Sequence, residues 1–284
     1  WKGGFDARVR ASSEEKTGSR LFGQGDVPGG PVTFFLTDPI DYSTRQLDAS
    51  LAYSGEQLQL TGGYYGTTFD NNMTALNVAG TFFTPLALPP GNQSHQLYLT
   101  GGYDISQTTR GTFSLAYAHA TQTETFVVPS STGRGNLGGR VDTTQAQLGL
   151  TARPIPKLTL MADARYSNRD DKTPIVQYNL SLPGATTNGT NEPRSVETTS
   201  ARIDAAYQLP AGFRLSGGAD YEEKYRSTYA IRLVSQREQT VESSYRVELR
   251  RTLSDTVSGA VSYVRSEREG SPFLTNVLNV TLSP

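Results

Sequence analysis

The sequence predicts an all-β protein, a transmembrane antiparallel up-and-down β-barrel of the bacterial outer-membrane type. Three observations lead to this prediction. A unit of strand, tight turn, strand and long polar loop recurs about every 50 residues. Within the expected strands apolar and polar residues alternate, as in a sheet with one face in lipid and the other in water. The composition, with 28 Gly, 15 Tyr and 11 Phe, favours strands and tight turns over packed helices.

Charge and cysteine content exclude several other classes of protein. The chain has 26 Lys and Arg against 27 Asp and Glu, a net charge of −1, so no general attraction to nucleic acid is expected. The absence of Cys excludes a disulfide scaffold, a Cys-ligated zinc site and a thiol nucleophile within these residues. No apolar run reaches about 18 residues, so no membrane-spanning helix is expected. A mean hydropathy of −0.45 remains compatible with a barrel, whose strands are apolar on one face only.

Turn signals and alternation together divide the chain, a single domain over residues 1–284, into about 12 strands. Strands are expected at residues 4–12, 44–53, 57–66, 95–104, 110–121, 143–153, 157–167, 198–208, 212–222, 241–252 and 256–267, with a possible twelfth at 274–282. Short turns are expected near residues 54–56, 106–108, 154–156, 210–212 and 254–256. The longer loops at 14–42, 67–93, 122–141 and 168–196 should be extracellular, because the short turns of such barrels face the periplasm.

One face of the expected strands is apolar and ends in tyrosine. Strands that leave a turn carry series such as Leu58, Leu60, Gly62, Tyr64 and Leu158, Leu160, Ala162, Ala164, Tyr166 on alternate positions. Strands that enter a turn have the tyrosine beside the turn instead. Phenol rings at both edges of an apolar band are typical of membrane interfaces. The residues expected there are Tyr53, Tyr64, Tyr103, Tyr117, Tyr166, Tyr207, Tyr221 and Tyr263.

The opposite face is polar and charged, which predicts contact with water or with a hydrated protein in the lumen. The candidates for contact with a partner in the lumen are Asp163, Arg165, Arg202, Asp204, Arg214, Asp220, Glu242, Arg246, Glu248 and Arg250. With Asp48, Glu222 and Arg153 added, acids and bases on this face nearly cancel. An ion-selective porin would show a biased constriction. The mixed charge fits either a channel for neutral solutes or a lumen that holds another protein.

A soluble β-sandwich or solenoid is the main structural alternative, since its strands also alternate. The asymmetry between short turns and long loops, and the tyrosines at the ends of the apolar series, favour the barrel.

Catalytic and metal sites have weak support. The two histidines, His95 and His119, lie on different expected strands without a ligand-spaced partner, and we expect both near the extracellular interface. Asp170 and Asp171 are adjacent, so they point in opposite directions in a strand and are expected to solvate a loop rather than form the carboxylate pair of an omptin-type protease. No serine within reach of His119 can be identified for a phospholipase. We therefore expect no catalytic, cofactor-binding or metal-binding residue.

Residues 86–126 carry a more specific signal than strand alternation. They include Leu88-Pro89-Pro90-Gly91-Asn92-Gln93, His95-Gln96-Leu97, Gly101-Gly102-Tyr103, Thr108-Thr109-Arg110 and Thr121-Gln122. The preceding hairpin contributes Thr44-Arg45-Gln46-Leu47, Gly63-Tyr64-Tyr65-Gly66 and Phe69-Asp70-Asn71. In these segments the chain resembles the MtrB/PioB family of decahaem-associated outer-membrane porins.

The resemblance implies a bacterial outer-membrane sheath around a periplasmic multihaem c-type cytochrome, through which electrons cross the membrane. An extracellular multihaem cytochrome is a possible second partner. Because no Cys-x-x-Cys-His occurs, any haem is expected in the partner, and the chain should contact membrane lipid but no nucleic acid. The family's N-terminal Cys-x-x-Cys is absent, and its barrels have about twice the strands counted here. We therefore expect a truncated chain. The alternative function is a standalone outer-membrane channel for small solutes.

Overall fold

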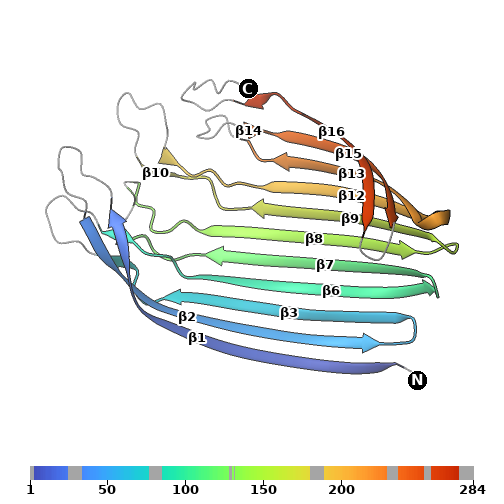
Figure 1. The fold of residues 1–284 in the computed structure, drawn as a ribbon. Coiled ribbons are helices and arrows are strands. Elements are labelled where there is room, and N and C mark those ends of the chain that lie inside the picture. The colour runs from blue at the N-terminus through green and yellow to red at the C-terminus, as the bar shows by residue number, and fades with distance from the viewer. Residues whose placement is uncertain are drawn as a thin grey trace.

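The computed structural model describes residues 3–24, 34–76, 85–127, 130, 132–179, 189–228, 236–252 and 257–274. Eleven strands form one antiparallel sheet in which each strand lies next to its neighbours in the sequence (Figure 1). They are β1 (Gly4–Gln24), β2 (Phe34–Ser54), β3 (Leu58–Asn71), β6 (Asn92–Ser106), β7 (Thr109–Gln122), β8 (Gly139–Ala152), β9 (Leu158–Asp171), β12 (Val196–Gln208), β13 (Phe213–Arg226), β15 (Gln239–Thr252) and β16 (Ser258–Gly270).

Three short strand pairs lie outside the long strands. They are β4 (Ala75–Leu76) with β5 (Leu86–Ala87), β10 (Gln177–Asn179) with β11 (Gly189–Thr190), and β14 (Gln236–Arg237) with β17 (Phe273–Leu274). One 3₁₀ turn, η1 (Pro210–Gly212), connects β12 to β13. The predicted all-β, up-and-down architecture is therefore confirmed.

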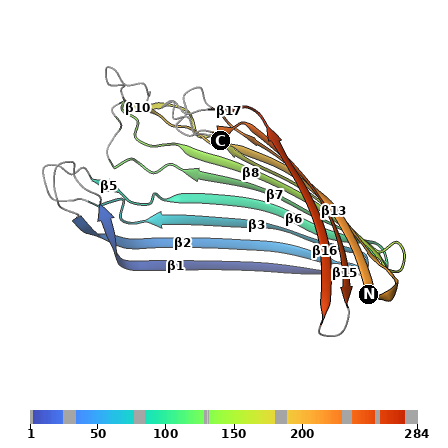
Figure 2. The ribbon, with the colours of Figure 1, turned by 45° about the horizontal axis from the view of Figure 1, so that its top comes forward.

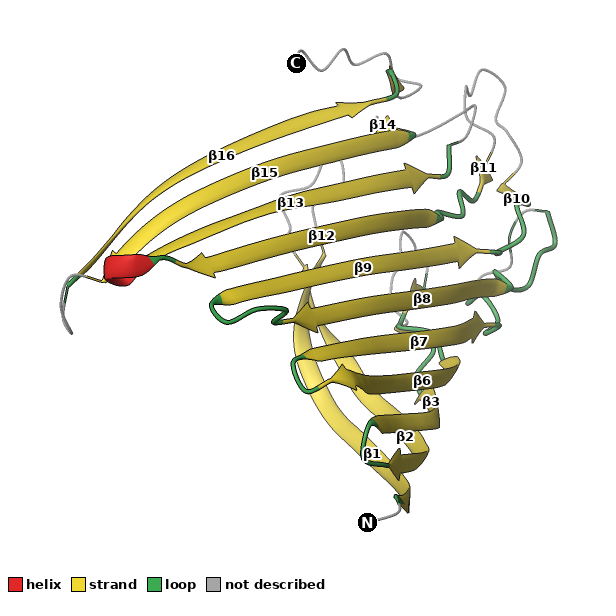
Figure 3. Ribbon diagram, turned by 90° about the vertical axis from the view of Figure 1, so that its right-hand side faces the viewer, coloured by secondary structure: helices red, strands yellow, loops and turns green. Residues whose placement is uncertain are grey.

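The sheet is twisted and open across the described residues. β1 and β16 run in clearly different directions, which is the accumulated twist of the eleven strands (Figures 2 and 3). Among the described strands, β1 pairs only with β2 and β16 pairs only with β15. An unpaired strand edge in lipid leaves its backbone N–H and C=O groups without partners, so these two edges need further pairing in a membrane.

All eleven expected strands are present, and most are longer than predicted. The prediction of a loop at 14–42 was wrong for its described part, because Glu14–Gln24 pairs with Phe34–Thr44 and extends the β1–β2 hairpin as a ribbon of 21-residue strands. This ribbon continues beyond the membrane band, where its residues need not alternate, so the period-two signal fades. β3 and β9 likewise continue into the expected loops, to Asn71 and Asp171. The turn at 254–256 and, apart from Leu274, the possible twelfth strand lie outside the described residues.

No packed apolar core exists within the described chain. The only apolar side chains that count as buried there are Leu88 and Ala152. The accessible surface is 19383 Å², whereas a compact soluble protein of this mass would expose about 12,000 Å². The soluble-sandwich alternative is therefore wrong.

The strand register joins the apolar series into one continuous band. Leu51 pairs with Gly62, Gly62 with Leu99, and Leu99 with Leu115. Residues opposite each other in a ladder share a face, so the apolar positions of all the strands lie on the same side. Side chains in this band are widely exposed, Leu97 and Ile203 each by 62%. From Leu158 to Tyr166 the band runs about 27 Å along β9, or about 20 Å across a membrane at the usual strand tilt.

No helix in the described part of the chain is long and apolar enough to cross a membrane.

Candidate functional site: the polar face of the sheet

All ten residues predicted to contact a partner in the lumen share the face opposite the apolar band. The register shows this directly. Arg202 pairs with Asp163 on one side and with Asp220 on the other, and Asp220 pairs with Ser244. Four neighbouring strands thus place acid, base, acid and hydroxyl in one row.

Four of the ten residues form a closed set of ion pairs at mid-height on β12, β13 and β15. Arg202 Nε lies 2.6 Å from Asp204 Oδ2 and 3.6 Å from Asp220 Oδ1. The Arg246 guanidinium donates from one nitrogen to Asp204 and from the other to Asp220. Two arginines and two aspartates cancel, so this part of the face is neutral although it is densely charged.

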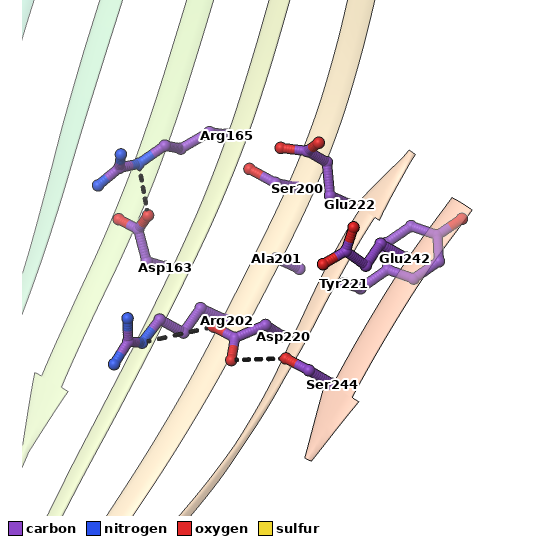
Figure 4. A pocket seen from close by; sticks show the side chains of 10 residues that line it. All are labelled: Asp163, Arg165, Ser200, Ala201, Arg202, Asp220, Tyr221, Glu222, Glu242 and Ser244. Atoms are coloured by element: carbon purple, nitrogen blue, oxygen red, sulfur yellow. Dashed lines mark hydrogen bonds and ion pairs between the residues drawn. The ribbon is translucent and has the colours of Figure 1, made fainter. Parts of the chain in front are cut away.

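Asp163 and Arg165 extend this cluster onto β9. Arg165 Nε donates to Asp163 Oδ1 at 2.7 Å, and the Gln147 amide donates to Asp163 Oδ2 at 2.9 Å. The side chains from β9, β12, β13 and β15 border a shallow hollow of about 310 Å³ (Figure 4). A hollow this open and hydrated suits contact with a broad protein surface or with water better than enclosure of a small ligand.

Gly218 makes the crossing contact between β12 and β15 possible. It lies on β13 between Asp204 and Arg246 in the register. A Cβ at this position would stand 2.5 Å from Asp204 Oδ1 and 2.8 Å from Arg246 Nη2. The missing side chain therefore leaves the space in which the two charged groups meet.

The other predicted residues are less closely engaged. Arg250 Nε lies 3.7 Å from Glu248 Oε1 near the turns. Arg268, which the sequence analysis did not single out, lies 3.7 Å from Glu242 near the loops. Arg214 faces Arg250 directly in the register and has no ion-pair partner among the described residues. Alternation alone could not reveal Arg268, Gln147 or Gly218 as members of these clusters, because their roles depend on which strand lies beside which.

The eight predicted interface tyrosines all share the apolar face. Tyr53, Tyr103 and Tyr207 lie beside the turns, and Tyr64, Tyr117, Tyr166 and Tyr221 lie toward the loops. Tyr263 lies near the middle of β16, where it pairs with Val247. At the loop end, Tyr166 donates to Glu197 at 3.3 Å and Tyr221 donates to Glu223 at 3.2 Å. On the same face of the sheet, each hydroxyl thus bonds to the carboxylate of the next residue toward the loops. This arrangement is expected at the interface between lipid and water.

The two histidines lie just beyond this tyrosine line, directly opposite each other on β6 and β7. The Tyr64 hydroxyl lies 2.6 Å from His95 Nδ1, and His119 Nδ1 lies 2.5 Å from Asp142 Oδ1. Lys172 donates to the other Asp142 oxygen at 2.8 Å, and this hydrogen bond raises the pKa of Lys172. Among the described residues, no three histidine or carboxylate side chains are grouped so that they could hold a metal ion.

Asp170 and Asp171 occur on opposite faces of β9, paired with Asp142 and Val141 respectively. Asp171 accepts hydrogen bonds from the backbone N–H groups of Thr173 and Arg194. It therefore connects two loop segments.

Comparison with known proteins identifies the family of the chain. A family model described as "Putative outer membrane beta-barrel porin, MtrB/PioB" matches residues 2–283. The chain belongs to the MtrB/PioB family. Outer membrane protein MtrB of Shewanella baltica is 26% identical over 287 residues, which cover 95% of this chain and 39% of that protein. The chain thus spans well under half the length of this relative.

Solved structures similar to the chain include two forms of the outer-membrane protein OmpT of Vibrio cholerae. OmpT aligns over 95% of this chain and 90% of its own with a TM-score of 0.38 and 9% identity. Its variant lacking loop L8 aligns over 94% of both chains with a TM-score of 0.33 and 11% identity. The chain therefore belongs to a family of outer-membrane β-barrel porins. In such a barrel the apolar face of the strands lies against lipid. Its family is a porin-like class rather than a class of enzymes.

Proposed function

We propose that this chain forms one sector of a barrel that encloses a periplasmic multihaem c-type cytochrome and supports electron transfer across the outer membrane. The observation that carries the proposal is the polar face, whose mid-height charges neutralise one another across three strands. Among the described strands, the sheet that carries this face has two unpaired edges. Such a face can lie against a hydrated protein without imposing a net field on it. The relative named MtrB and the family match support the same assignment.

The size of the lumen gives a second, quantitative argument. Strands about 4.8 Å apart and tilted by about 40° give an eleven-strand barrel a backbone radius of about 11 Å. Inward side chains would then fill most of the interior. Doubling the strand number doubles the radius to about 22 Å, which is wide enough for a folded polypeptide. We therefore infer that further strands pair with the edges of β1 and β16.

The proposed orientation places the short turns in the periplasm and the long loops outside the cell. In this orientation the cytochrome enters from the turn side, and an extracellular multihaem cytochrome could meet the loop side. The haem belongs to the partner, since the chain has no cysteine with which to attach a c-type haem.

A standalone channel for small solutes is the second candidate, because the polar face has no strong excess of either charge and the family is porin-like. Purified full-length protein in planar bilayers distinguishes the two. Stable single-channel conductance that the partner does not block supports the channel.

The test of the sheath is co-purification from native outer membranes in mild detergent. The folded barrel is recognised by its heat-dependent shift in electrophoresis, and the haem by its Soret absorbance. We expect a fixed ratio of haem to barrel that survives size exclusion. Folded barrel that is consistently free of haem would overturn the sheath.

A further inference from the structure

A groove of about 700 Å³ lies at the turn end of the polar face, outside the ion-paired cluster. The turn between β8 and β9 forms one wall, and β12 and the start of β13 form the other. Arg153, Lys157 and Arg214 line it, and no aspartate or glutamate is among the described residues that do. We propose that this turn-end groove binds an acidic segment of the protein that enters the barrel.

The three cations of the groove are available to a partner. Within the described chain, none of them has a carboxylate within ion-pair distance, and all three residues are exposed. At mid-height, by contrast, Arg202 and Arg246 are each engaged with two aspartates. Exposed cations held close together repel each other, so a carboxylate-bearing segment would relieve that repulsion as it binds.

The groove also has apolar contacts to offer. Met161 and Ala206 are apolar residues on the polar face, and Ile155 lines the groove from the turn. Met161 and Ile155 are each 51% exposed. A polypeptide segment that presents both carboxylates and apolar side chains would match this surface, whereas a small inorganic anion would use the cations alone.

The turn that carries two of the cations is held in place before any partner arrives. Pro154 and Pro156 restrict its backbone, and Lys157 adopts a φ of 76°, a conformation that non-glycine residues rarely take. The Arg153 N–H donates to the Thr108 carbonyl at 2.8 Å, and the Gln208 N–H donates to the Lys157 carbonyl at 2.9 Å. These bonds tie the turn to both neighbouring hairpins, so binding costs little ordering of the backbone.

The face on which the groove lies distinguishes a protein ligand from lipid. Arg214, Gln208 and Met161 are on the lumen-facing side of the register. Arg251 is the turn-end cation on the lipid-facing side, where its guanidinium lies 4.8 Å from the centre of the Phe213 ring. Lipid phosphate should therefore meet Arg251, and the turn-end groove should meet the contents of the lumen.

Charge along the height of the face would also orient the partner. The turn end is basic, whereas mid-height is neutral and Glu222 and Glu242 nearer the loops are paired with Lys224 and Arg268. A partner whose trailing part is acidic would therefore meet complementary charge at the turn end. The inference deepens the proposed function and rests on it for the identity of the partner.

The first experiment needs no knowledge of the partner. Full-length barrel in detergent is titrated with fluorescein-labelled hexaglutamate, and with a neutral Gly-Ser peptide, while anisotropy is recorded. The test variant combines Arg153→Glu, Lys157→Glu and Arg214→Glu. The matched control combines Lys16→Glu, Arg134→Glu and Arg237→Glu, which makes the same change of charge at the loop end. We expect hexaglutamate affinity to fall at least tenfold in the test variant, to change less than twofold in the control, and to weaken with salt.

The second experiment uses the native complex. NaCl is raised stepwise over immobilised barrel, and the haem that elutes is measured. The test variant should release haem at a lower salt concentration than the wild type or the control. Equal peptide binding by the test and control variants would overturn the proposed role of the groove, even if haem is retained and the proposed sheath function holds. Tight binding of wild-type protein to anionic vesicles through the three cations, without hexaglutamate binding, would overturn it in favour of lipid.

The failure of the sheath itself would look different. If the wild-type barrel purifies without haem, the proposed cytochrome partner is ruled out. The peptide titration still decides whether the groove binds carboxylates. A variant with Arg153→Gln, Lys157→Gln and Arg214→Gln guards against misfolding. It should lose affinity to a smaller degree than the charge reversal, and both variants should show the wild-type heat-dependent shift.

Discussion

Arg246 on β15 forms an ion pair with Asp204 on β12 across the intervening strand β13. The contact passes over Gly218, which has no side chain to block it. In Gly218→Ala the new Cβ would occupy the space in which the two charged groups meet, so the substitution should disrupt the pair. The Cβ would also stand 2.8 Å from the Ile203 carbonyl oxygen, a backbone atom that cannot easily move. We expect a loss of about 1 kcal/mol in the free energy of unfolding, measured by urea titration in detergent.

The neighbouring glycine is the matched control for this substitution. A Cβ at Gly217 would meet its nearest atoms at 3.5 Å and 3.9 Å, which is ordinary packing distance. Gly217→Ala should be neutral to within about 0.5 kcal/mol. Equal losses for the two variants would show that the space over Gly218 has no special role.

Arg246→Ala should destabilise the barrel more than Arg250→Ala. Arg246 holds two aspartates and is about 30% exposed, whereas Arg250 approaches one glutamate at 3.7 Å and is about 58% exposed. Exposed pairs contribute little, and removal of the cation from the tighter cluster leaves Asp204 and Asp220 with Arg202 alone. We expect a difference of about 1 kcal/mol in unfolding titrations. A larger loss for Arg250→Ala would contradict the cluster described here.

Leu99→Arg should impair insertion into a bilayer, whereas Thr100→Arg should not. The two residues are adjacent on β6 at the same height, with Leu99 on the lipid-facing side and Thr100 on the polar side. An arginine near the middle of the lipid band costs about 2–4 kcal/mol. Folding into vesicles, followed by the heat-dependent shift, measures the effect. Comparable folding of both variants would mean that the assignment of faces is reversed or wrong.

The side chain of Lys172 should remain protonated to a higher pH than an ordinary lysine. The hydrogen bond that Lys172 donates to Asp142, and then the charge of Asp142, raise the Lys172 pKa above the usual 10.5. Stability from this pair is complete below that usual value and is lost as pH rises through the folded-state pKa. Amine-labelling rates at pH 9 to 11, read by mass spectrometry, should increase for Lys172 in Asp142→Asn. An unchanged rate would show that the contact does not hold in solution.

Sequence reasoning identified the faces of this protein better than the contacts on them. Period-two alternation was sufficient to place Asp163, Arg202 and Asp220 on one side and Tyr166 and Tyr221 on the other. Successive side chains of a strand point to opposite faces of the sheet. The pairing of Asp204 with Arg246 was hidden, since it depends on the register of two strands that do not touch. The contact of His119 with Asp142 was also hidden, because it depends on the register of β7 against β8.

The ends of the strands were the least predictable part of the fold. Residues 14–24 and 34–42 lack clean alternation, yet they continue β1 and β2 as a paired ribbon. Outside lipid neither face of such a ribbon has to be apolar, so its side chains carry no period-two signal. The role proposed for the turn-end groove was equally invisible, because Arg153, Lys157 and Arg214 converge only when β9 and β13 flank β12.

Crosslinking from the two faces of the sheet tests whether this chain forms a wall around a haem protein. The absence of cysteine within these residues allows Ser200→Cys on the polar face and Ala201→Cys on the lipid-facing side to carry the same photocrosslinker in otherwise identical barrels. In native membranes, Ser200→Cys should give a crosslinked product that stains for haem, and Ala201→Cys should give none. Haem-free products from both positions would show that the polar face does not line a haem protein.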